Sequence, residues 1–283
     1  MSAVSVATLR ALYRYPVKSM IGETLDATEL GENGIPGDRS WAVRDETLGG
    51  IRGAKRFAEL MRCSAHTRGA DEAPEIELPT GERFAASDPS AAARMSAWLG
   101  SPVTLWPLLP KEMLEHYRRG APLEADMMKE LRRIFARTTA EPLPDLSALP
   151  EILRKYESPP GTYFDAFPIL VVSRQSLAAL ERRMPTSRFD ARRFRPNLLV
   201  DAHDDGEFPE RAWVGKRLRV GTAVLDVKME CPRCVMTTLP LADLPADASI
   251  MRTLVRETQG MLGVYATVAE AGAVRAGDAV AFA

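Results

Sequence analysis

The pattern of hydrophobic and polar positions predicts a chain built mainly of β-strands. Short segments rich in β-forming residues, several of them with alternating apolar and polar positions, recur along the whole sequence and are separated by turn residues. The segment Phe167–Val172 is a continuous apolar run, which is typical of a buried strand. The strands predicted in this way cover residues 4–15, 25–30, 40–44, 75–78, 82–85, 103–109, 167–172, 198–201, 213–220, 224–227, 260–268 and 279–282.

Helical spacing of apolar residues is confined to a few segments. The Ser-Asp-Pro sequence at 87–89 is typical of a helix start, and a helix over residues 91–99 is expected to end at Gly100. Residues 173–183 begin with a capping serine and predict a second helix. A third, short amphipathic helix is predicted over residues 249–257. Together these elements predict a mainly β fold with helical insertions, in the α+β class.

The composition of the chain changes near residue 110. Between about residues 110 and 160, methionines and leucines recur at helical spacing and prolines interrupt them, so we expect one or two helices joined by irregular segments. The methionines are interpreted as core packing or a lid. We therefore predict a first domain over residues 1–109 and a second over residues 110–283, with the helical segment inserted at the start of the second.

Length, charge and composition then limit the class of protein. A length of 283 residues is typical of about two domains. A net charge of −1 and a pI of about 6.4 leave no basic field for nucleic acid. No apolar run approaches the ~20 residues of a membrane span. The N-terminus does not resemble a secretory signal, and three cysteines do not make a disulfide framework. The simplest expectation is a cytoplasmic protein that binds neither membrane nor nucleic acid.

Two of the three cysteines, Cys231 and Cys234, are separated only by Pro232 and Arg233. A guanidinium beside a thiol favours the thiolate, which is the reactive form of cysteine. A thiolate is also a soft ligand, and it suits a redox metal better than a hard cation such as magnesium. The segment over residues 227–239 is therefore the first candidate for chemistry.

Other interpretations of this cysteine pair remain open at this point. The pair could supply half of a structural zinc site, with Cys63 and His66 as the other ligands. It could be a thioredoxin-like redox pair, although the β-branched residues and Pro240 that follow argue against the helix that such a pair opens. It could also be two small buried hydrophobic residues. Spacing alone does not choose among these interpretations.

Arginines at two places before the cysteines are also candidates for a binding site. Arg39 lies where a glycine-rich loop is expected to enter a strand, so its guanidinium either faces a cleft or pairs with Asp38 or Glu46. Four more arginines crowd one predicted loop, together with Asp190, before the strand predicted at residues 198–201. They either form a solvated face or coordinate one anion through their planar donor forks. The four are Arg188, Arg192, Arg193 and Arg195.

Seven short motifs, in a fixed order, resemble those of the MOSC family, which is named for the C-terminal domain of molybdenum cofactor sulfurases. The resemblance covers nearly the whole chain, and the two-domain members that share the pattern are similar to bacterial and mitochondrial amidoxime- or hydroxylamine-reducing proteins. The motifs are YPVKS at 15–19, GDRSW at 37–41, FRPN at 194–197, WVG at 213–215, CPRCVMTT at 231–238, LGVY at 262–265 and VRAGD at 274–278.

The resemblance implies an N-terminal β-barrel domain, a MOSC β-barrel domain and a molybdenum–molybdopterin cofactor (Moco). It places the metal ligand and catalytic residue at Cys234, and it implies that Cys231 is not a ligand. Charge-assisted donors suit the phosphate of the cofactor, and hydroxyl and amide groups suit its polar ring. The cofactor-binding residues implied in this way are Lys18, Ser19, Arg39, Arg195, Asn197 and Arg233, of which Arg233 is expected to keep Cys234 ionised.

The function implied by the resemblance is reduction of the N–O bond of small N-hydroxylated molecules. Some relatives carry a C-terminal iron–sulfur domain that is not expected in this chain. The electrons are therefore expected to come from a separate donor protein, a ferredoxin or a flavin-type reductase. The alternative is a sulfur carrier or transferase that holds a persulfide on Cys234, because the same reactive thiolate would serve that chemistry.

Overall fold

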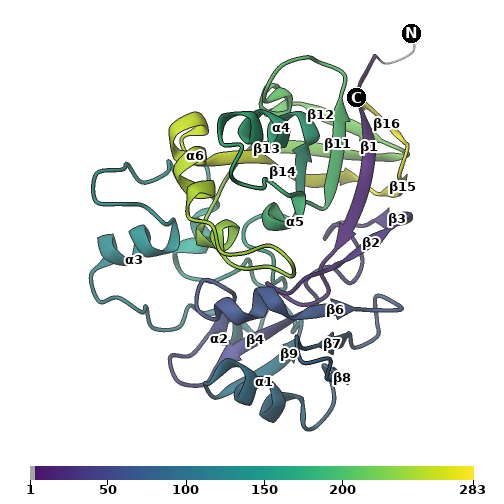
Figure 1. Cartoon of the computed structure of the whole chain (residues 1–283). Helices are drawn as coiled ribbons and strands as arrows, with labels where there is room; N and C mark the ends of the chain where they lie inside the picture. Colours follow the sequence, from purple (N-terminus) through teal and green to yellow (C-terminus); the bar gives the residue numbers. More distant parts are fainter. Residues whose placement is uncertain (1–3) are drawn as a thin grey trace.

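The computed structural model describes residues 4–283, and its largest element is a closed barrel of seven strands within that range (Figure 1). Only β10 and β11 are parallel neighbours, and the other pairs around the barrel are antiparallel. In order around the barrel, the strands are β1 (Ser5–Arg14), β11 (Leu198–Ala202), β10 (Ile169–Ser173), β14 (Met261–Glu270), β13 (Ala223–Pro232), β12 (Arg217–Val220) and β16 (Ala279–Phe282).

The first strand closes the barrel. Along β1, Leu9 lies opposite Val200 of β11, and Thr8 lies opposite Ala279 of β16. Leu9 is fully buried in the apolar interior, together with residues of every other barrel strand. The short strand β2 (Glu23–Leu25) also pairs with β1. Next along the chain, β3 (Ala27–Leu30) pairs with β15 (Gly272–Arg275) in a separate two-stranded sheet. The barrel is therefore built from both ends of the chain.

Three helices lie together on one side of the barrel (Figure 1). They are α4 (Arg174–Arg183), α5 (Ala191–Phe194) and α6 (Ser249–Thr258). The Ser173 hydroxyl accepts a hydrogen bond from the Ser176 amide and so caps α4 as predicted. Apolar residues of α4 and α6 pack on the outer face of β10 and β14 in a second core, which includes Cys231.

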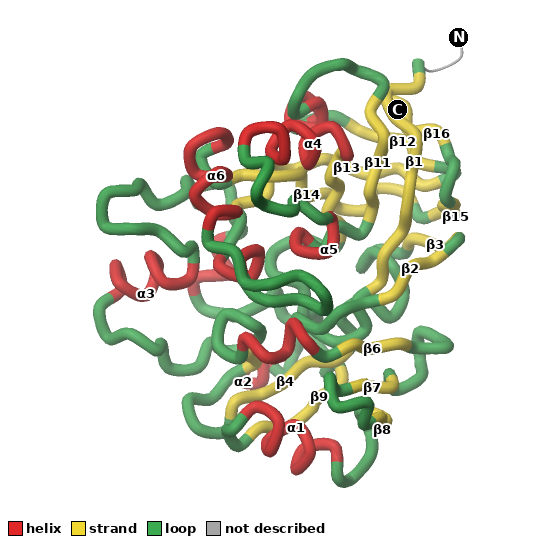
Figure 2. Tube along the Cα trace, in the orientation of Figure 1, coloured by secondary structure: helices red, strands yellow, loops and turns green. Residues whose placement is uncertain are grey.

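A second part of the molecule lies below the barrel in Figure 2 and contains two three-stranded sheets. In the first, β4 (Trp41–Asp45) lies between β5 (Ile51–Arg52) and β9 (Val103–Pro107). In the second, β7 (Glu75–Glu77) lies between β6 (Ser64–His66) and β8 (Arg83–Ala85). The helix α1 (Ala91–Leu99) ends at Gly100 in the left-handed conformation, as the sequence predicts.

The segment over residues 110–160 is mostly irregular, as expected. It contains α2 (Leu114–Tyr117), α3 (Met127–Ile134) and a 3-10 turn over Glu151–Arg154. The side chains of Met113, Met127 and Met128 are exposed, so the interpretation of these methionines as core packing is wrong. No helix within residues 4–283 is both long and apolar enough to cross a membrane.

A few local predictions are also wrong. The segment over residues 191–194 is the helix α5 and not a loop, because the Asp190 side chain accepts the Arg192 amide and caps it. The segment over Pro209–Trp213 is a 3-10 helix, so the strand predicted from residue 213 begins at Arg217. A 3-10 turn over Val235–Thr238 follows the cysteines, where no helix was expected.

Candidate functional site

One cavity is lined by all seven predicted site residues. It holds about 620 Å³ of empty space, counting the part that is open to solvent. Its walls come from the loop after β1, the segments that lead into β10 and β11, the end of β13, and β14. The lining residues are Lys18, Ser19, Arg39, Asp165, Phe167, Leu170, Arg193, Phe194, Arg195, Asn197, Cys231, Pro232, Arg233, Cys234, Met236 and Tyr265.

Two arginines of the cavity share one aromatic ring. The guanidinium carbon of Arg195 lies 4.2 Å from the Tyr15 ring centroid, and that of Arg39 lies 5.3 Å from it. Burial, together with the neighbouring charge of Arg39, lowers the pKa of Arg195 to about 10. Arg39 also pairs with Asp38, as one reading of the sequence expected. Two like charges held this close in a buried site favour the binding of an anion between them.

The cavity holds hydrogen-bond donors that no protein group satisfies. Within residues 4–283, the buried side-chain nitrogens without a partner are Arg193 Nε, Arg195 Nη2 and Arg233 Nε, and all three arginines line the cavity. A buried donor without an acceptor is costly and calls for a ligand or an ordered water. The lining has one carboxylate, Asp165, against five cations, which are Lys18, Arg39, Arg193, Arg195 and Arg233. These residues fit a phosphate-bearing cofactor.

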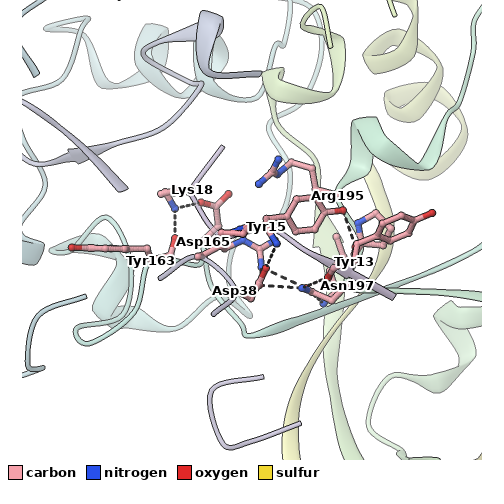
Figure 3. Close-up of polar contacts among 12 residues, drawn as sticks. Tyr13, Tyr15, Lys18, Asp38, Tyr163, Asp165, Arg195 and Asn197 are labelled. Carbon is pink, nitrogen blue, oxygen red and sulfur yellow. Dashed lines mark hydrogen bonds and ion pairs between the residues drawn. The ribbon is translucent and has the colours of Figure 1, made fainter. Parts of the chain in front are cut away.

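Lys18 is not free to donate to a ligand in this arrangement. Its Nζ donates to Asp165 Oδ1 and to the Tyr163 carbonyl, both at 2.7 Å, as Figure 3 shows. Burial lowers the pKa of Lys18, and Asp165 opposes that change. A second cation, Lys55, reaches the other oxygen of Asp165 at 3.5 Å. Burial would raise the pKa of Asp165, but the two lysines outweigh it and hold that pKa well below its usual range.

Ser19 and Asn197 are also engaged by the protein. The Ser19 hydroxyl accepts a hydrogen bond from the Ala54 amide at 3.0 Å. Asn197 donates to Asp38 at 3.0 Å (Figure 3). It also accepts a hydrogen bond from the Leu170 amide at 3.2 Å, so it connects the loop before β4 to β10. The geometry gives these two residues a role in holding the walls of the cavity, and their predicted contacts with a cofactor stay predictions.

The two cysteines differ in their surroundings. Cys234 is half-buried, follows the last residues of β13 and lines the cavity. Cys231 is buried in β13, and its sulfur accepts a hydrogen bond from Arg233 Nη1 at 2.9 Å. The guanidinium of Arg233 thus bonds to the first cysteine, and the expectation that it keeps Cys234 ionised stays a prediction. Arg233 and Lys55 are both close enough for their charges to interact with Cys234.

The four arginines before β11 divide between two roles. Arg188 and Arg192 are on the surface and pair with Asp243, and Arg192 also pairs with Asp190. These two match the interpretation as a solvated face. Arg193 and Arg195 are buried at the cavity, which matches the interpretation as an anion site.

Arg193 also fastens the chain after Cys234. Its two terminal nitrogens donate to the Leu239 carbonyl at 3.0 Å and to the Pro245 carbonyl at 2.7 Å. The loop that follows the second cysteine is thereby held against α5.

The zinc interpretation is not supported. Nowhere in the described range, residues 4–283, does a group of three or more His, Cys, Asp or Glu side chains form that could hold a metal ion. Cys63 is buried in the core beneath the small sheets, and burial raises the pKa of its thiol to about 12. The His66 side chain is half-exposed beside Glu23. Four ligands at these positions do not form a metal site.

Several residues of the site carry no signal in the sequence. Asp165 and Lys55 lie in irregular segments without a recognisable motif, and only the fold brings both lysines, Lys18 and Lys55, to Asp165. Tyr265 belongs to a matched motif, but its ring packs against Phe167, with centroids 5.3 Å apart, through a contact that spacing does not reveal. Tyr15 likewise lies in the same motif as Lys18, and its position between two arginines depends on Arg195, which is distant in the sequence.

Two family models and several known proteins match the chain. The model of the MOSC domain matches residues 159–281, and the model of the MOSC N-terminal beta barrel domain matches residues 6–98. Mitochondrial amidoxime reducing component 2 from Rattus norvegicus is 26% identical over 312 residues, which cover 97% of this chain and 83% of the rat protein. The Bos taurus protein of the same name is 29% identical over 136 residues, and this match covers 42% of the chain and 38% of the bovine protein.

A solved structure also matches over most of the chain. The YUAD protein from Bacillus subtilis aligns with a TM-score of 0.46 and 15% identity, and the alignment covers 97% of this chain and 94% of that one. The two family models together span most of the sequence, in the order N-terminal barrel domain and then MOSC domain. The chain belongs to the MOSC-domain family.

Proposed function

We propose that this protein binds a molybdenum–molybdopterin cofactor and reduces small N-hydroxylated compounds. Similarity to the amidoxime reducing components motivates the reaction, and family membership motivates the cofactor. The electrons would come from a separate donor protein, a ferredoxin or a flavin-type reductase.

One observation carries the proposal. The seven predicted site residues come from four distant segments and line one cavity. In it a half-buried thiol, Cys234, lies with buried guanidinium donors that have no acceptor among the described residues. An anionic cofactor would satisfy those donors, and a soft metal would take the thiolate.

The proposed roles follow from which side chains still have hydrogen-bond donors without a partner in the described part of the chain. Arg195 and Arg233 hold unpartnered nitrogens and would bind the phosphate or the ring system. Arg39 stands beside Arg195 on Tyr15 and would add charge at the same place. Lys18, Ser19 and Asn197 would act mainly by holding the cavity walls, and Lys18 would reach a phosphate only by exchanging Asp165 or Tyr163 for it.

When bound, the cofactor would supply the two-electron exchange that breaks the N–O bond. The overall reaction takes two electrons and two protons, and it turns an N–OH group into N–H and water. The chain's own residues would orient the substrate and supply charge. The ammonium groups of Lys18 and Lys55 keep the cavity positive around Asp165, and Phe167 and Tyr265 offer an apolar wall for the substrate.

The test is the content and activity of protein purified from a host that makes the cofactor. We expect molybdenum and pterin in near-equal amounts per chain, and reduction of benzamidoxime with an artificial electron donor. Cys234→Ser should lose both molybdenum and activity, whereas Cys63→Ser, a buried thiol outside the cavity, should keep them. Wild-type protein that holds no metal and does not reduce the substrate would refute the proposal.

The second candidate, a sulfur carrier, rests on the same half-buried Cys234 in a positive cavity. A persulfide carries a negative charge that the unpartnered arginine nitrogens would also stabilise. Mass spectrometry separates the two candidates, because a labile added sulfur on Cys234 without bound pterin favours the carrier.

A further inference from the structure

The sulfur of the first cysteine holds the side chain of another cavity residue, Arg233. Cys231 is 1% exposed and lies near the end of β13. Its sulfur accepts a hydrogen bond from Arg233 Nη1 at 2.9 Å. The sulfur is therefore part of a polar network inside the barrel wall, and it does more than fill space there.

The network determines where Arg233 points. Its second terminal nitrogen, Nη2, donates to the Phe194 carbonyl at 2.6 Å, and its guanidinium lies 5.5 Å from the Phe194 ring centroid. A guanidinium is rigid and planar, so anchoring both terminal nitrogens also sets the direction of Nε. That third nitrogen is buried and has no partner among residues 4–283. Arg233 as a whole is only 7% exposed and lines the cavity.

Cys231 itself is poorly suited to ligate a metal or attack a substrate. Burial raises the pKa of its thiol, and the charge of Arg233 offsets that rise only in part. A protonated thiol is a weak nucleophile and a weak ligand. Its lone pairs nevertheless remain available to accept the hydrogen bond from Arg233.

We propose that Cys231 is a positioning residue, whose sulfur holds Arg233 so that Nε–H is directed at the anionic ligand of the cavity. The identity of that ligand rests on the proposed function. The role of Cys231 rests on the hydrogen bond that it accepts from Arg233 and on the unpartnered Nε of that arginine.

Two variants of Cys231 separate positioning from other roles. Cys231→Ser keeps an acceptor of nearly the same size for Arg233, and Cys231→Ala removes the acceptor with little loss of volume. In full-length holoprotein dialysed against buffer, we expect Cys231→Ser to retain pterin and molybdenum as wild type does. Cys231→Ala should lose them about three- to tenfold faster, as expected for loss of one buried hydrogen bond to a charged group. Cys63→Ala, buried outside the cavity, is the control for a lost thiol.

A second measurement does not depend on the cofactor. Binding of inorganic phosphate to the cofactor-free full chain should be about three- to tenfold weaker in Cys231→Ala and unchanged in Cys231→Ser. If wild-type protein contains neither pterin nor molybdenum, the proposed function fails, and the phosphate series still decides the role of Cys231.

Three results would overturn the inference. Cys231→Ser could behave like Cys231→Ala, which would mean that the sulfur itself is required. Cys231→Ala could bind phosphate and retain cofactor as wild type does, which would mean that the hydrogen bond positions nothing. A disulfide between Cys231 and Cys234 in active protein, detected by mass spectrometry under non-reducing conditions, would assign the pair a redox role instead.

Discussion

At the scale of single residues, the site is marked by backbone conformation as well as by charge. Ser19, Arg39 and Arg195 all have positive φ, at 69°, 49° and 54°. Residues other than glycine rarely adopt this conformation, and each instance costs on the order of 1–3 kcal/mol. Strain of this kind persists where the surrounding structure requires it, and here it places one hydroxyl and two guanidinium groups at a single cavity.

Arg195 is the site residue whose role depends most on the planar shape of its guanidinium group. In Arg195→Lys the stacking on Tyr15 and the unpartnered Nη2 would both be lost, although the charge is kept. We expect about tenfold weaker binding of inorganic phosphate to the cofactor-free chain, in line with the loss of one charge-assisted hydrogen bond. Arg192→Lys is the matched control, since Arg192 pairs on the surface with Asp190 and Asp243. Equal effects of the two substitutions would contradict a special role for Arg195.

The low pKa of Asp165 predicts a particular pH dependence of the protein's stability. Because its pKa is held well below the usual value, the carboxylate contributes stability above about pH 4, where the unfolded state also ionises. That contribution is lost as the pH falls toward the pKa in the folded state. Asp165→Asn should be less stable than wild type by about 1–3 kcal/mol at pH 7, because buried Lys18 loses its counter-charge.

The measurement is urea unfolding of both proteins between pH 3 and pH 7. The difference between wild type and Asp165→Asn should shrink steadily below pH 4 and stay constant above pH 5. A difference that does not change with pH would show that the carboxylate charge has no part in it.

At the scale of elements, the cavity depends on segments that pack behind it. The segment after α3 places Arg137 against the end of α6, where its guanidinium reaches the Gln259 carbonyl and the sulfur of Met251. The carbonyl oxygen of Gly260, the residue after Gln259, accepts a hydrogen bond from the backbone amide of Arg233 at 2.8 Å. The irregular segment over residues 110–160 thus supports the wall that carries the cysteines.

Gly260→Ala tests this support. A Cβ at this position would lie 1.9 Å from Arg137 Nη2, and the residue has a φ of +85°. We expect a loss of about 2–4 kcal/mol in the free energy of unfolding, from strain and displacement together. Gly81→Ala isolates the strain, because Gly81 has a φ of +86° and nothing within 4 Å of an added Cβ. Thermal or urea unfolding measures the loss of stability in each variant. Equal losses for Gly260→Ala and Gly81→Ala would mean that Arg137 moves aside freely.

At the scale of the whole molecule, β1 joins the two matched family ranges. It lies within residues 6–98 along most of its length, yet it pairs with β11 and β16 in the barrel formed by residues 169–282. The predicted division at residues 109 and 110 therefore separates a barrel strand from its partners in space. Two domains that share a sheet are not expected to fold as independent units.

We expect residues 110–283 expressed alone to be insoluble or without a cooperative unfolding transition. Without β1, the edges of β11 and β16 are left unpaired, and the apolar interior is open where Leu9 and Leu12 would lie. Circular dichroism and thermal unfolding of this fragment, compared with the full chain, provide the check. A fragment that unfolds cooperatively would support the division as predicted.

Much of the architecture was determined by the sequence alone. Alternating and continuous apolar runs located most barrel strands, and the capping residues of α1 and α4 marked where those helices begin or end, because periodicity and capping act between near neighbours. The motifs also named seven residues that line one cavity, including Cys234 and Arg195. These inferences need only the chain within a few residues of each site.

Only the tertiary structure decided which partner each polar group takes. Arg233 turns to Cys231, Lys18 to Asp165 and Asn197 to Asp38, and the last two contacts join segments more than a hundred residues apart. A long charged side chain has several acceptors within reach of its sequence position. The choice among them depends on burial and on the packing of distant elements, which local sequence does not encode.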